Sequence, residues 1–586
     1  MARRRSHRGY GASRRSSVGP IGTIDIHARG YAFCDTDEGS FFVPRSALGG
    51  AMPGDKVELR VSSRDVPDGG KRSAKVTRVV SRATEYLIGT LEINDPLAVV
   101  VAQDPRVRHD LFITDGHTGG AHDGDVVLTR ITSYPDRRQP MQGYVVEVLG
   151  AADAPGMDVD IIIHNLDLPT KFSPQALEQA EGIEVDVEAA LAEPGRHDLR
   201  MRDIFTIDPT DAKDFDDAIS LDEVDGMLRL GVHIADVSSY VAWDSHIDIC
   251  ARDRATSVYL VDRVLPMLPE KLSNDVCSLR PGEDRLTMTC DMYLDASANV
   301  RRYEIYPSVI CSKRRFDYDE VQDILDGKRD DPYAAKLARF DALATRLLSL
   351  RLARGAIDFE TVEAKPVLDE RGMVMRVDLR HKTDATSMIE EAMILANETV
   401  ARHAHANDVP FVYRVHEPPS AAALEALLPP LRELGYSVAE LATGNPAAFQ
   451  DVLDEAHGTR EEPLVNYLVL RSMERAAYNT EPIGHFGLAS TFYCHFTSPI
   501  RRYPDLMVHR LLKDSHAMET HLQWLAKHSS KMERLAERAE RDSVELKLCE
   551  YLAERIGEVF TGTISTVVAR GLYVRLENTL EGFVRF

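Results

Sequence analysis

The sequence predicts a multidomain α+β protein with two small N-terminal β-barrels, a large mixed α/β domain and the start of a further barrel at its C-terminal end. Three observations lead to this fold class. The 586 residues are too many for one hydrophobic core. An internal repeat fills the N-terminal quarter, and strand-like and helical patterns alternate through the central half. The composition, 44% hydrophobic and 28% charged, is typical of globular proteins, and no apolar run reaches the roughly 18 residues of a membrane span.

The internal repeat predicts the two N-terminal barrels. "IGTIDI" at 21–26 returns as "IGTLEI" at 88–93, and "GDKVELRV" at 54–61 returns as "GDVVLTRI" at 124–131. Each copy consists of short strand-like runs separated by Gly, Pro and Asp. Five such runs in about 65 residues suit the oligonucleotide-binding (OB) barrel. We therefore expect one OB domain over residues 19–82 and a second over 83–150.

Aromatic residues in the first repeat indicate a possible surface for nucleic acid. Tyr31 and Phe33 alternate onto one face of a strand, with Phe41 or Phe42 on a neighbouring strand. Aromatic side chains on such a face stack unpaired bases at about 1–3 kcal/mol per base. The alternative is that they fill the barrel core, and the sequence leaves both interpretations open.

The remaining boundaries follow from changes in composition. The first 17 residues hold six arginines and no acidic residue, and no apolar segment follows, which favours a basic RNA-contacting tail over a secretion signal or a transit peptide. The last segment is about half the length of an OB barrel, so we expect a chain that stops short of its final domain. The predicted parts besides the two barrels are a tail at 1–18, a linker with a helix from about Ser173 at 151–199, the α/β domain at 200–515, helices at 516–556 and the partial barrel at 557–586.

Cysteine usage and net charge limit the possible classes of protein. The seven cysteines are scattered without a Cys-x-x-Cys pair, which argues against a zinc ribbon or a disulfide scaffold and favours the reducing cytoplasm. The net charge of −23 argues against a protein that coats nucleic acid with its outer surface. It still permits a strand bound within a locally basic channel.

The most informative segment is "TIDPTDAKDFDDAISL" at 206–221, which holds five aspartates: Asp208, Asp211, Asp214, Asp216 and Asp217. It leads into a predicted β-hairpin with a turn at Asp225-Gly226. The apolar strand draws the carboxylates toward the core, where each unpaired charge costs several kcal/mol. A divalent cation removes this penalty, and oxygen ligands without a His/Cys set favour Mg²⁺ over zinc. The alternative is a solvated acidic loop.

Four long segments carry a resemblance to a known family: "DPTDAKDFDDA", "TSVYLVDRVLPMLPEKLSNDVCSLRPGEDRLTM", "MIEEAMILAN" and "HFTSPIRRYPDLMVHRLL". They resemble the RNase II/RNase R family of exoribonucleases, and the segment around Tyr259 is closer to the RNase R branch. The resemblance implies two cold-shock OB domains, a catalytic RNB domain and the start of a C-terminal RNA-binding OB domain. It also implies a cytoplasmic, membrane-free monomer that degrades single-stranded RNA processively from the 3′ end to nucleoside 5′-monophosphates with Mg²⁺, for which Mn²⁺ can substitute.

The same resemblance implies roles for particular residues. Metal binding falls to Asp208, Asp214, Asp216 and Asp217, and catalysis to Asp214 and Asp216 together with Arg501, which contacts the phosphate. The implied RNA contacts are the base-clamping Tyr259 and Phe359, Tyr318 near the terminal phosphates, Glu390 at the terminal ribose and Arg502 beside Arg501. The adjacent Glu391 stays open as the alternative to Glu390.

Two other functions compete with the exonuclease. One is a non-catalytic OB-fold RNA-binding or RNA-chaperone protein, and the intact aspartate cluster together with Arg501 argues against it. The other is a different aspartate-dependent Mg²⁺ enzyme, such as a phosphatase or a glycosyltransferase. Such an enzyme would have no evident use for repeated strand-binding barrels.

Overall fold

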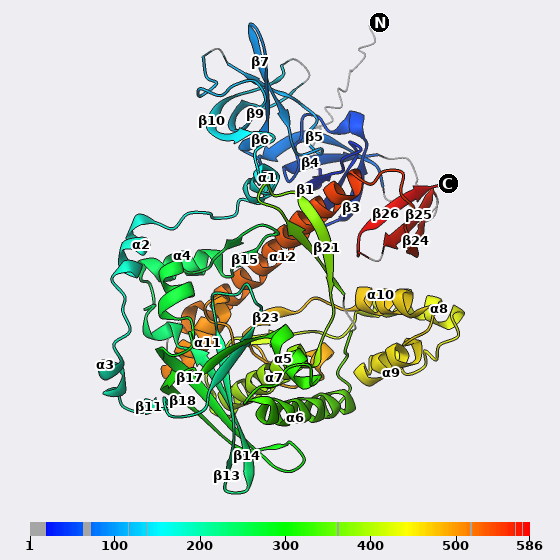
Figure 1. The fold of residues 1–586 in the computed structure, drawn as a ribbon. Helices are drawn as coiled ribbons and strands as arrows, with labels where there is room; N and C mark the ends of the chain where they lie inside the picture. Colours follow the sequence, from blue (N-terminus) through cyan, green and yellow to red (C-terminus); the bar gives the residue numbers. More distant parts are fainter. Residues whose placement is uncertain are drawn as a thin grey trace, which may run out of the picture. The chain divides into compact units, whose positions relative to one another are not determined.

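The computed structural model describes residues 19–62, 72–114, 116–136, 139–359, 362–515, 519–568, 570–576 and 578–586 (Figure 1). The predicted basic tail at 1–18 lies outside these residues. The chain divides into two compact units, Met1–Leu168 and Pro169–Phe586. Within the described residues, no helix is both long and apolar enough to cross a membrane.

The first unit begins with a five-stranded antiparallel sheet whose strand order is β3-β2-β1-β4-β5. Alternate residues of its strands are buried, as expected for a barrel with one face toward its core. A single parallel bridge between Phe42 and Ser73 links its two edges. The strands are β1 (Ile21–Ile26), β2 (Ala32–Thr36), β3 (Gly39–Val43), β4 (Lys56–Val61) and β5 (Ala74–Ser81).

The second repeat forms a closed five-stranded barrel, as predicted. Its core is aliphatic, with Leu91, Val100, Leu111 and Val127 fully buried. A helix that the sequence analysis did not predict, α1 (Met157–Asn165), follows the barrel and packs on its last strand. The strands are β6 (Tyr86–Asn94), β7 (Leu97–Ala102), β8 (Leu111–Ile113), β9 (Asp125–Ser133) and β10 (Met141–Ala151).

The second unit is built on a seven-stranded mixed sheet of order β11-β18-β17-β14-β13-β12-β19. The predicted hairpin is confirmed: β13 pairs with β14 from Asp217↔Ile234 to Val224↔Met227. Its turn residues Asp225 and Gly226 have φ of 51° and 75°, the left-handed pair that a two-residue hairpin loop needs. The strands are β11 (His197–Asp198), β12 (Phe205–Asp208), β13 (Asp217–Val224), β14 (Met227–Ala235), β17 (Asp284–Leu294), β18 (Val300–Cys311) and β19 (Arg314–Asp317).

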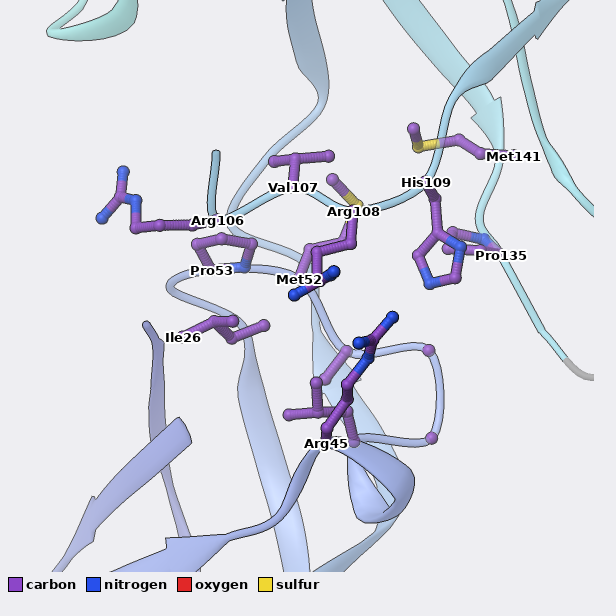
Figure 2. A pocket seen from close by; sticks show the side chains of 14 residues that line it. Ile26, Arg45, Met52, Pro53, Arg106, Val107, Arg108, His109, Pro135 and Met141 are labelled. Atoms are coloured by element: carbon purple, nitrogen blue, oxygen red, sulfur yellow. The ribbon is translucent and has the colours of Figure 1, made fainter. Parts of the chain in front are cut away.

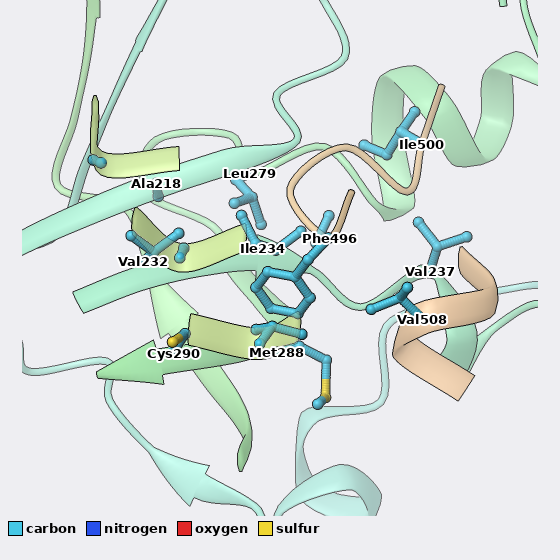
Figure 3. Close-up of a cluster of buried hydrophobic side chains, with 14 of the residues drawn as sticks. Ala218, Val232, Ile234, Val237, Leu279, Met288, Cys290, Phe496, Ile500 and Val508 are labelled. Carbon is cyan, nitrogen blue, oxygen red and sulfur yellow. The ribbon is translucent and has the colours of Figure 1, made fainter. Parts of the chain in front are cut away.

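Helices cover this sheet, and the region before helix α11 (Tyr503–Lys513) packs directly on it. Phe496 lies against Ile234 and Met288 of the sheet, in a buried cluster that also contains Ile500 and Val508 (Figure 3). This packing carries the residues at 496–502 to the end of β12 and β13, where the aspartates lie. The other helices of the sheet region are α4 (His246–Arg254), α5 (Tyr318–Leu325), α6 (Ala334–Ala353) and α7 (Asp384–Ala406).

The predicted helix near Ser173 is confirmed as α2 (Pro174–Glu181), because the Ser173 side chain caps it by accepting from the Ala176 amide. A separate apolar cluster joins three helices at 421–472. The long helix α12 leads to a three-stranded antiparallel sheet at the C-terminal end. The remaining elements are α3 (Val187–Leu191), α8 (Ala421–Glu433), α9 (Pro446–Ala456), α10 (Glu462–Ser472), α12 (Leu522–Ala553), β15 (Val258–Tyr259), β16 (Val264–Leu265), β20 (Glu363–Leu368), β21 (Val374–Arg380), β22 (Tyr413–Val415), β23 (Ala477–Asn479), β24 (Gly562–Val568), β25 (Gly571–Leu576) and β26 (Glu581–Arg585).

Candidate active site

The four implicated aspartates lie in and beside the loop that joins β12 to β13. Asp208 is the last residue of β12 and Asp217 the first of β13. The two strands are paired at Phe205↔Ile219 and diverge beyond it. The loop between them therefore projects beyond the ends of β12 and β13, while its own two ends stay close together.

Two side chains fix the path of this loop. Arg315 of β19 donates from Nη2 to the Pro209 and Thr210 carbonyls at 2.7 and 2.8 Å. Ser278 accepts from the Phe215 amide at 3.0 Å and donates to the Lys213 carbonyl at 2.7 Å. The acidic segment is thus anchored at both ends, which argues against a freely solvated loop.

Asp216 is 4% exposed and is held on three sides. Its Oδ1 accepts from the Ile500 amide at 2.8 Å, and its carbonyl accepts from the Ala235 amide at 2.8 Å. Its Oδ2 is buried without a hydrogen-bond partner among the described residues and lies 3.6 Å from Arg501 Nε. Burial raises the pKa of Asp216 well above its usual range, and Arg501 only partly opposes this. Such an oxygen has an unsatisfied need for positive charge.

Asp208 and Asp217 are also buried carboxylates whose negative charge is not fully compensated. Asp208 is 8% exposed, and its Oδ2 has no hydrogen-bond partner among the described residues. Burial, followed by repulsion from Asp217, raises the pKa of Asp208 well above its usual range. Burial also raises the pKa of Asp217 to about 6, against the opposing charges of Arg501 and Arg502.

Two of the predicted tyrosines reach this cluster. The Tyr259 hydroxyl donates to Asp214 Oδ2 at 3.3 Å. Burial raises the pKa of Tyr318, and the charges of Asp217 and Asp208 raise it further. Tyr318 begins α5, directly after the strand that pairs in parallel with β12. By contrast, Asp211 is exposed and pairs with Lys365 at 2.8 Å.

The two adjacent arginines have different surroundings. The Arg501 side chain is 41% exposed, and its Nη2 donates to Ser498 Oγ at 3.1 Å. Arg502 is largely buried at the start of α11, and it donates to both oxygens of Asp505 at 2.7 and 2.9 Å. Arg501 therefore has donors available for a ligand, whereas Arg502 is engaged in a structural ion pair. An RNA contact by Arg502 stays a prediction with less geometric support.

The structure separates the roles of the two adjacent glutamates on α7. The Glu391 side chain is 3% exposed and pairs with the buried Arg351 at 2.6 Å. The Glu390 side chain is 40% exposed and pairs with Lys382 at 2.9 Å. Of the two, Glu390 is the one accessible to a ribose.

Phe359 lies next to the same ionic network. Lys382 also pairs with Asp358 at 3.1 Å, so one lysine ties Glu390 to the residue that precedes Phe359. The Phe359 ring is half-buried against the apolar cluster of helices α8 to α10. Among the described residues, no hydrogen bond or ion pair connects this group with the four aspartates.

Three aromatic residues of the first barrel, Tyr31, Phe33 and Phe42, lie outside its core. Ala32 and Cys34 point into the barrel, and the half-buried Tyr31 and Phe33 lie on the opposite face of β2. Their ring centroids are 5.9 Å apart, and Phe42 lies 5.7 Å from Phe33. The open question between Phe41 and Phe42 is settled, since Phe41 is a core residue. The core interpretation of Tyr31 and Phe33 is wrong, and their contact with RNA stays a prediction.

Sequence reasoning missed three residues that position the site. Besides Ser278, Asp505 accepts from the Ser498 amide at 2.8 Å, and Asn397 Oδ1 accepts from the Phe496 amide at 2.9 Å. Both fix the turn that presents Arg501. The only signal was a polar side chain within an apolar run. Ser278 and Asn397 contact loops 63 and 99 residues away in sequence, and Asp505 contacts an amide 7 residues before it.

The donor atoms of the four aspartates determine which metal ion they could hold. No group of three or more His, Cys, Asp or Glu side chains in the described ranges is already arranged to hold one. The donor set nevertheless consists of carboxylate oxygens alone, and Asp208 Oδ2 and Asp216 Oδ2 are both buried without hydrogen-bond partners there. Hard divalent cations such as Mg²⁺ prefer oxygen ligands of this kind. The residues fit such an ion, because it would supply the missing positive charge.

Comparison with known families places this site in a defined class. The RNB domain family matches residues 196–517, the cold shock domain family matches 100–173, and the ribonuclease B OB domain family matches 22–79. The chain therefore belongs to the RNB domain family, with OB-type domains before its RNB domain.

Individual relatives narrow this class. The chain is 37% identical to ribonuclease R of Aquifex aeolicus and 39% identical to ribonuclease R of Thermotoga maritima, in each case over 96% of this chain and 82% of the relative. A solved structure of Mycoplasma genitalium RNase R with ribose-methylated single-stranded RNA superimposes with a TM-score of 0.90 at 28% identity, covering 96% of this chain and 92% of that one. The chain belongs to the ribonuclease R family, and it is an exoribonuclease.

Proposed function

We propose that this chain degrades single-stranded RNA from the 3′ end, processively and by hydrolysis, and releases nucleoside 5′-monophosphates in a Mg²⁺-dependent reaction. The observation that carries the proposal is the buried Asp216 Oδ2, which has no hydrogen-bond partner within the described ranges and lies beside the accessible Arg501. The Asp216 carboxylate requires a cation, and the neighbouring Arg501 guanidinium can bind an anion. Together they match the charges of a metal ion bound to a phosphodiester. A protein that only binds RNA would gain nothing from burying this carboxylate.

The metal would be held by Asp208, Asp214, Asp216 and Asp217, and the same oxygen ligands suit Mn²⁺. When bound, a divalent ion activates water as a nucleophile and stabilises the charge on the leaving oxygen. The amide of Ile500 and the strand contact of Ala235 orient Asp216 independently of the ion. The carboxylate thus keeps its place between turnovers.

Protein groups bind and orient the substrate. Arg501 offers a planar set of donors to the reacting phosphate, where a fixed guanidinium stabilises developing negative charge. The hydroxyl of Tyr259, which donates to Asp214, holds that ring at the edge of the site, so that its face can stack on a base. Phe359 would grip a second base, and Tyr318 would lie near the terminal phosphates.

Selectivity for RNA would come from Glu390, whose exposed carboxylate can accept from a ribose 2′-hydroxyl. Tyr31 and Phe33, with Phe42, would stack unpaired bases on the first barrel without reading their sequence. These barrels over 19–82 and 83–150 would collect the strand, and the domain at 200–515 would cleave it.

The setting that we propose is a monomer in the cytoplasm. All seven cysteines are free, which suits a reducing compartment. Light scattering during gel filtration tests the oligomeric state, and a mass near 65.3 kDa is expected.

The test of the function uses RNA labelled at its 5′ end, with Mg²⁺ and with EDTA. We expect the label to pass through steadily shorter products to a short remnant with metal and to stay at full length with EDTA. An internally labelled strand should release its label as nucleoside 5′-monophosphate. A single-stranded DNA of the same sequence is the control and should persist. RNA that is retarded on a gel but never shortened would instead support the binding-only alternative.

A further inference from the structure

A cavity of about 200 Å³ in the N-terminal unit is lined by both barrels. The segment 45–53 comes from the first barrel, and 106–109 together with Pro135 and Met141 comes from the second (Figure 2). Neither the carboxylate cluster nor the aromatic face of Tyr31 and Phe33 contributes to it. It is therefore a separate site candidate.

Cationic side chains converge on this cavity. Figure 2 shows the Arg45 guanidinium directed between Arg108 and the ring of His109. Both arginines cross over Gly30, where an added Cβ would lie 2.7 Å from Arg108 Nη1 and 3.3 Å from Arg45 Cδ. With a φ of +88°, Gly30 is also at a position that disfavours any side chain. The backbone therefore leaves the space in which arginines of two different barrels approach each other.

In the part of the chain that the structure describes, three of the polar side chains of this cavity have no acidic partner. Within the described part of the chain, neither Arg45, Arg108 nor His109 makes a hydrogen bond or an ion pair. Arg106, in contrast, is neutralised by a two-pronged contact with Asp104, at 2.7 Å for the shorter ion-pair distance. Among its described residues, the cavity lining contains no Asp or Glu, although the chain carries a net charge of −23. Two like charges held together in this way favour an anion between them.

The rest of the lining indicates what the anion is attached to. The floor is aliphatic and thioether, formed by Ile26, Leu48, Met52, Val107 and Met141. Among the described lining residues there is no Phe, Tyr or Trp, so the His109 ring is the only one there on which a base could stack. An apolar floor under a cationic rim suits a small organic phosphate better than inorganic phosphate or an extended strand.

We propose that this cavity binds a phosphate monoester of about the size of a ribose phosphate, such as the 5′-phosphate end of a free mononucleotide. A monoester carries about −1.5 to −2 charge at neutral pH, which matches the two guanidinium groups. Each phosphodiester of an RNA strand carries only one negative charge. The size of the cavity admits a phosphate and its sugar and excludes several nucleotides. A mononucleotide would be the product of the reaction only if the proposed function is correct. The proposal of a phosphate site does not depend on that function.

The test is calorimetric titration of the full chain with adenosine 5′-monophosphate in EDTA, which removes metal-dependent binding at the carboxylates. We expect one saturable site, weaker binding of inorganic phosphate and no binding of adenosine. The double variant Arg45→Gln/Arg108→Gln should bind about tenfold or more weakly. The matched control, Arg60→Gln/Arg78→Gln, removes two exposed charges from the first barrel and should bind like wild type. Circular dichroism checks that each variant is folded, and His109→Gln serves as an independent variant with an expected several-fold loss.

Three results would overturn the proposal. They are equal binding by wild type and the double variant, equal binding of adenosine and its monophosphate, and no binding to wild type at millimolar ligand. A ribose-methylated oligonucleotide without terminal phosphates separates the two sources of phosphate. If it displaces the monophosphate as well as unlabelled monophosphate does, the site takes RNA backbone and the monoester assignment fails. RNA degradation, measured separately, reports on the proposed function and not on this site.

Discussion

Replacing Asp216 by Asn isolates the charge of one buried carboxylate. The side chain keeps its shape, and its Oδ1 can still accept from the Ile500 amide at 2.8 Å. What disappears is the negative charge on Oδ2, the atom 3.6 Å from Arg501 Nε. Loss of one preorganised charge-stabilising group typically lowers turnover by about 10²–10³-fold, and loss of a metal-binding oxygen adds to this. We therefore expect at least this decrease in turnover.

Asp216→Asn should lower turnover but should not lower the stability of the metal-free fold. Because burial raises the pKa of Asp216 far above its usual range, the ionised side chain destabilises the metal-free fold at neutral pH. Asp216→Asn should therefore melt at the same temperature as wild type in EDTA, or at a higher one. RNA affinity should change little, since the strand is bound over many other contacts.

The assay combines single-turnover degradation of 5′-labelled RNA, filter binding in EDTA and thermal melting. The matched control is Asp211→Asn, the same change at an exposed position of the same loop, which should leave turnover within about threefold of wild type. Wild-type turnover by Asp216→Asn would refute the reasoning. So would a large fall in its melting temperature, because the residue would then be structural.

Three further predictions concern other parts of the chain. The folded state binds protons at Asp217 (pKa about 6) more tightly than the unfolded chain does, so metal-free stability falls as pH rises from about 4 through 6. Mg²⁺ should therefore raise the melting temperature more at pH 7 than at pH 5, and a pH-independent shift in scanning fluorimetry would contradict this. Glu391→Gln breaks a buried ion pair and should lower the free energy of unfolding in urea by about 3–5 kcal/mol. Glu390→Gln should cost under about 1 kcal/mol but reduce the preference for RNA over DNA, and the reverse pattern would exchange their roles. Tyr31→Ala should weaken RNA binding by about 1–3 kcal/mol at nearly unchanged stability, whereas Phe41→Ala should lower stability by about 3–5 kcal/mol, and equal stability losses would show that Tyr31 is a core residue.

The sequence predicted correctly those elements that depend only on residues close to one another in the chain, such as turns and helix caps. Asp225-Gly226 needs only its own φ angles to form the hairpin turn, and Ser173 needs only the amide three residues later to begin a helix. The pleat of β3 decides between Phe41 and Phe42, but only once the register is fixed by pairing with β2.

The candidate site depends on contacts that no local pattern contains. Ser278 reaches a loop 63 residues away, and Asn397 holds an amide 99 residues away. Arg501 and Arg502 are adjacent in sequence, and only their partners in the fold separate them: Arg502 is paired with Asp505, whereas Arg501 is exposed beside Asp216. The aspartate cluster itself was visible because its members are close in sequence.

The contact between Asp216 and Ile500 joins two segments that are far apart in the chain. The carboxylates are translated early, but the amide and the guanidinium that complete their surroundings come 284 residues later. A nascent chain that has not yet extended past residue 501 carries the acids without their counterpart. Folding of the candidate site therefore requires both halves of the catalytic domain, and a fragment that ends before residue 500 lacks the amide that orients Asp216.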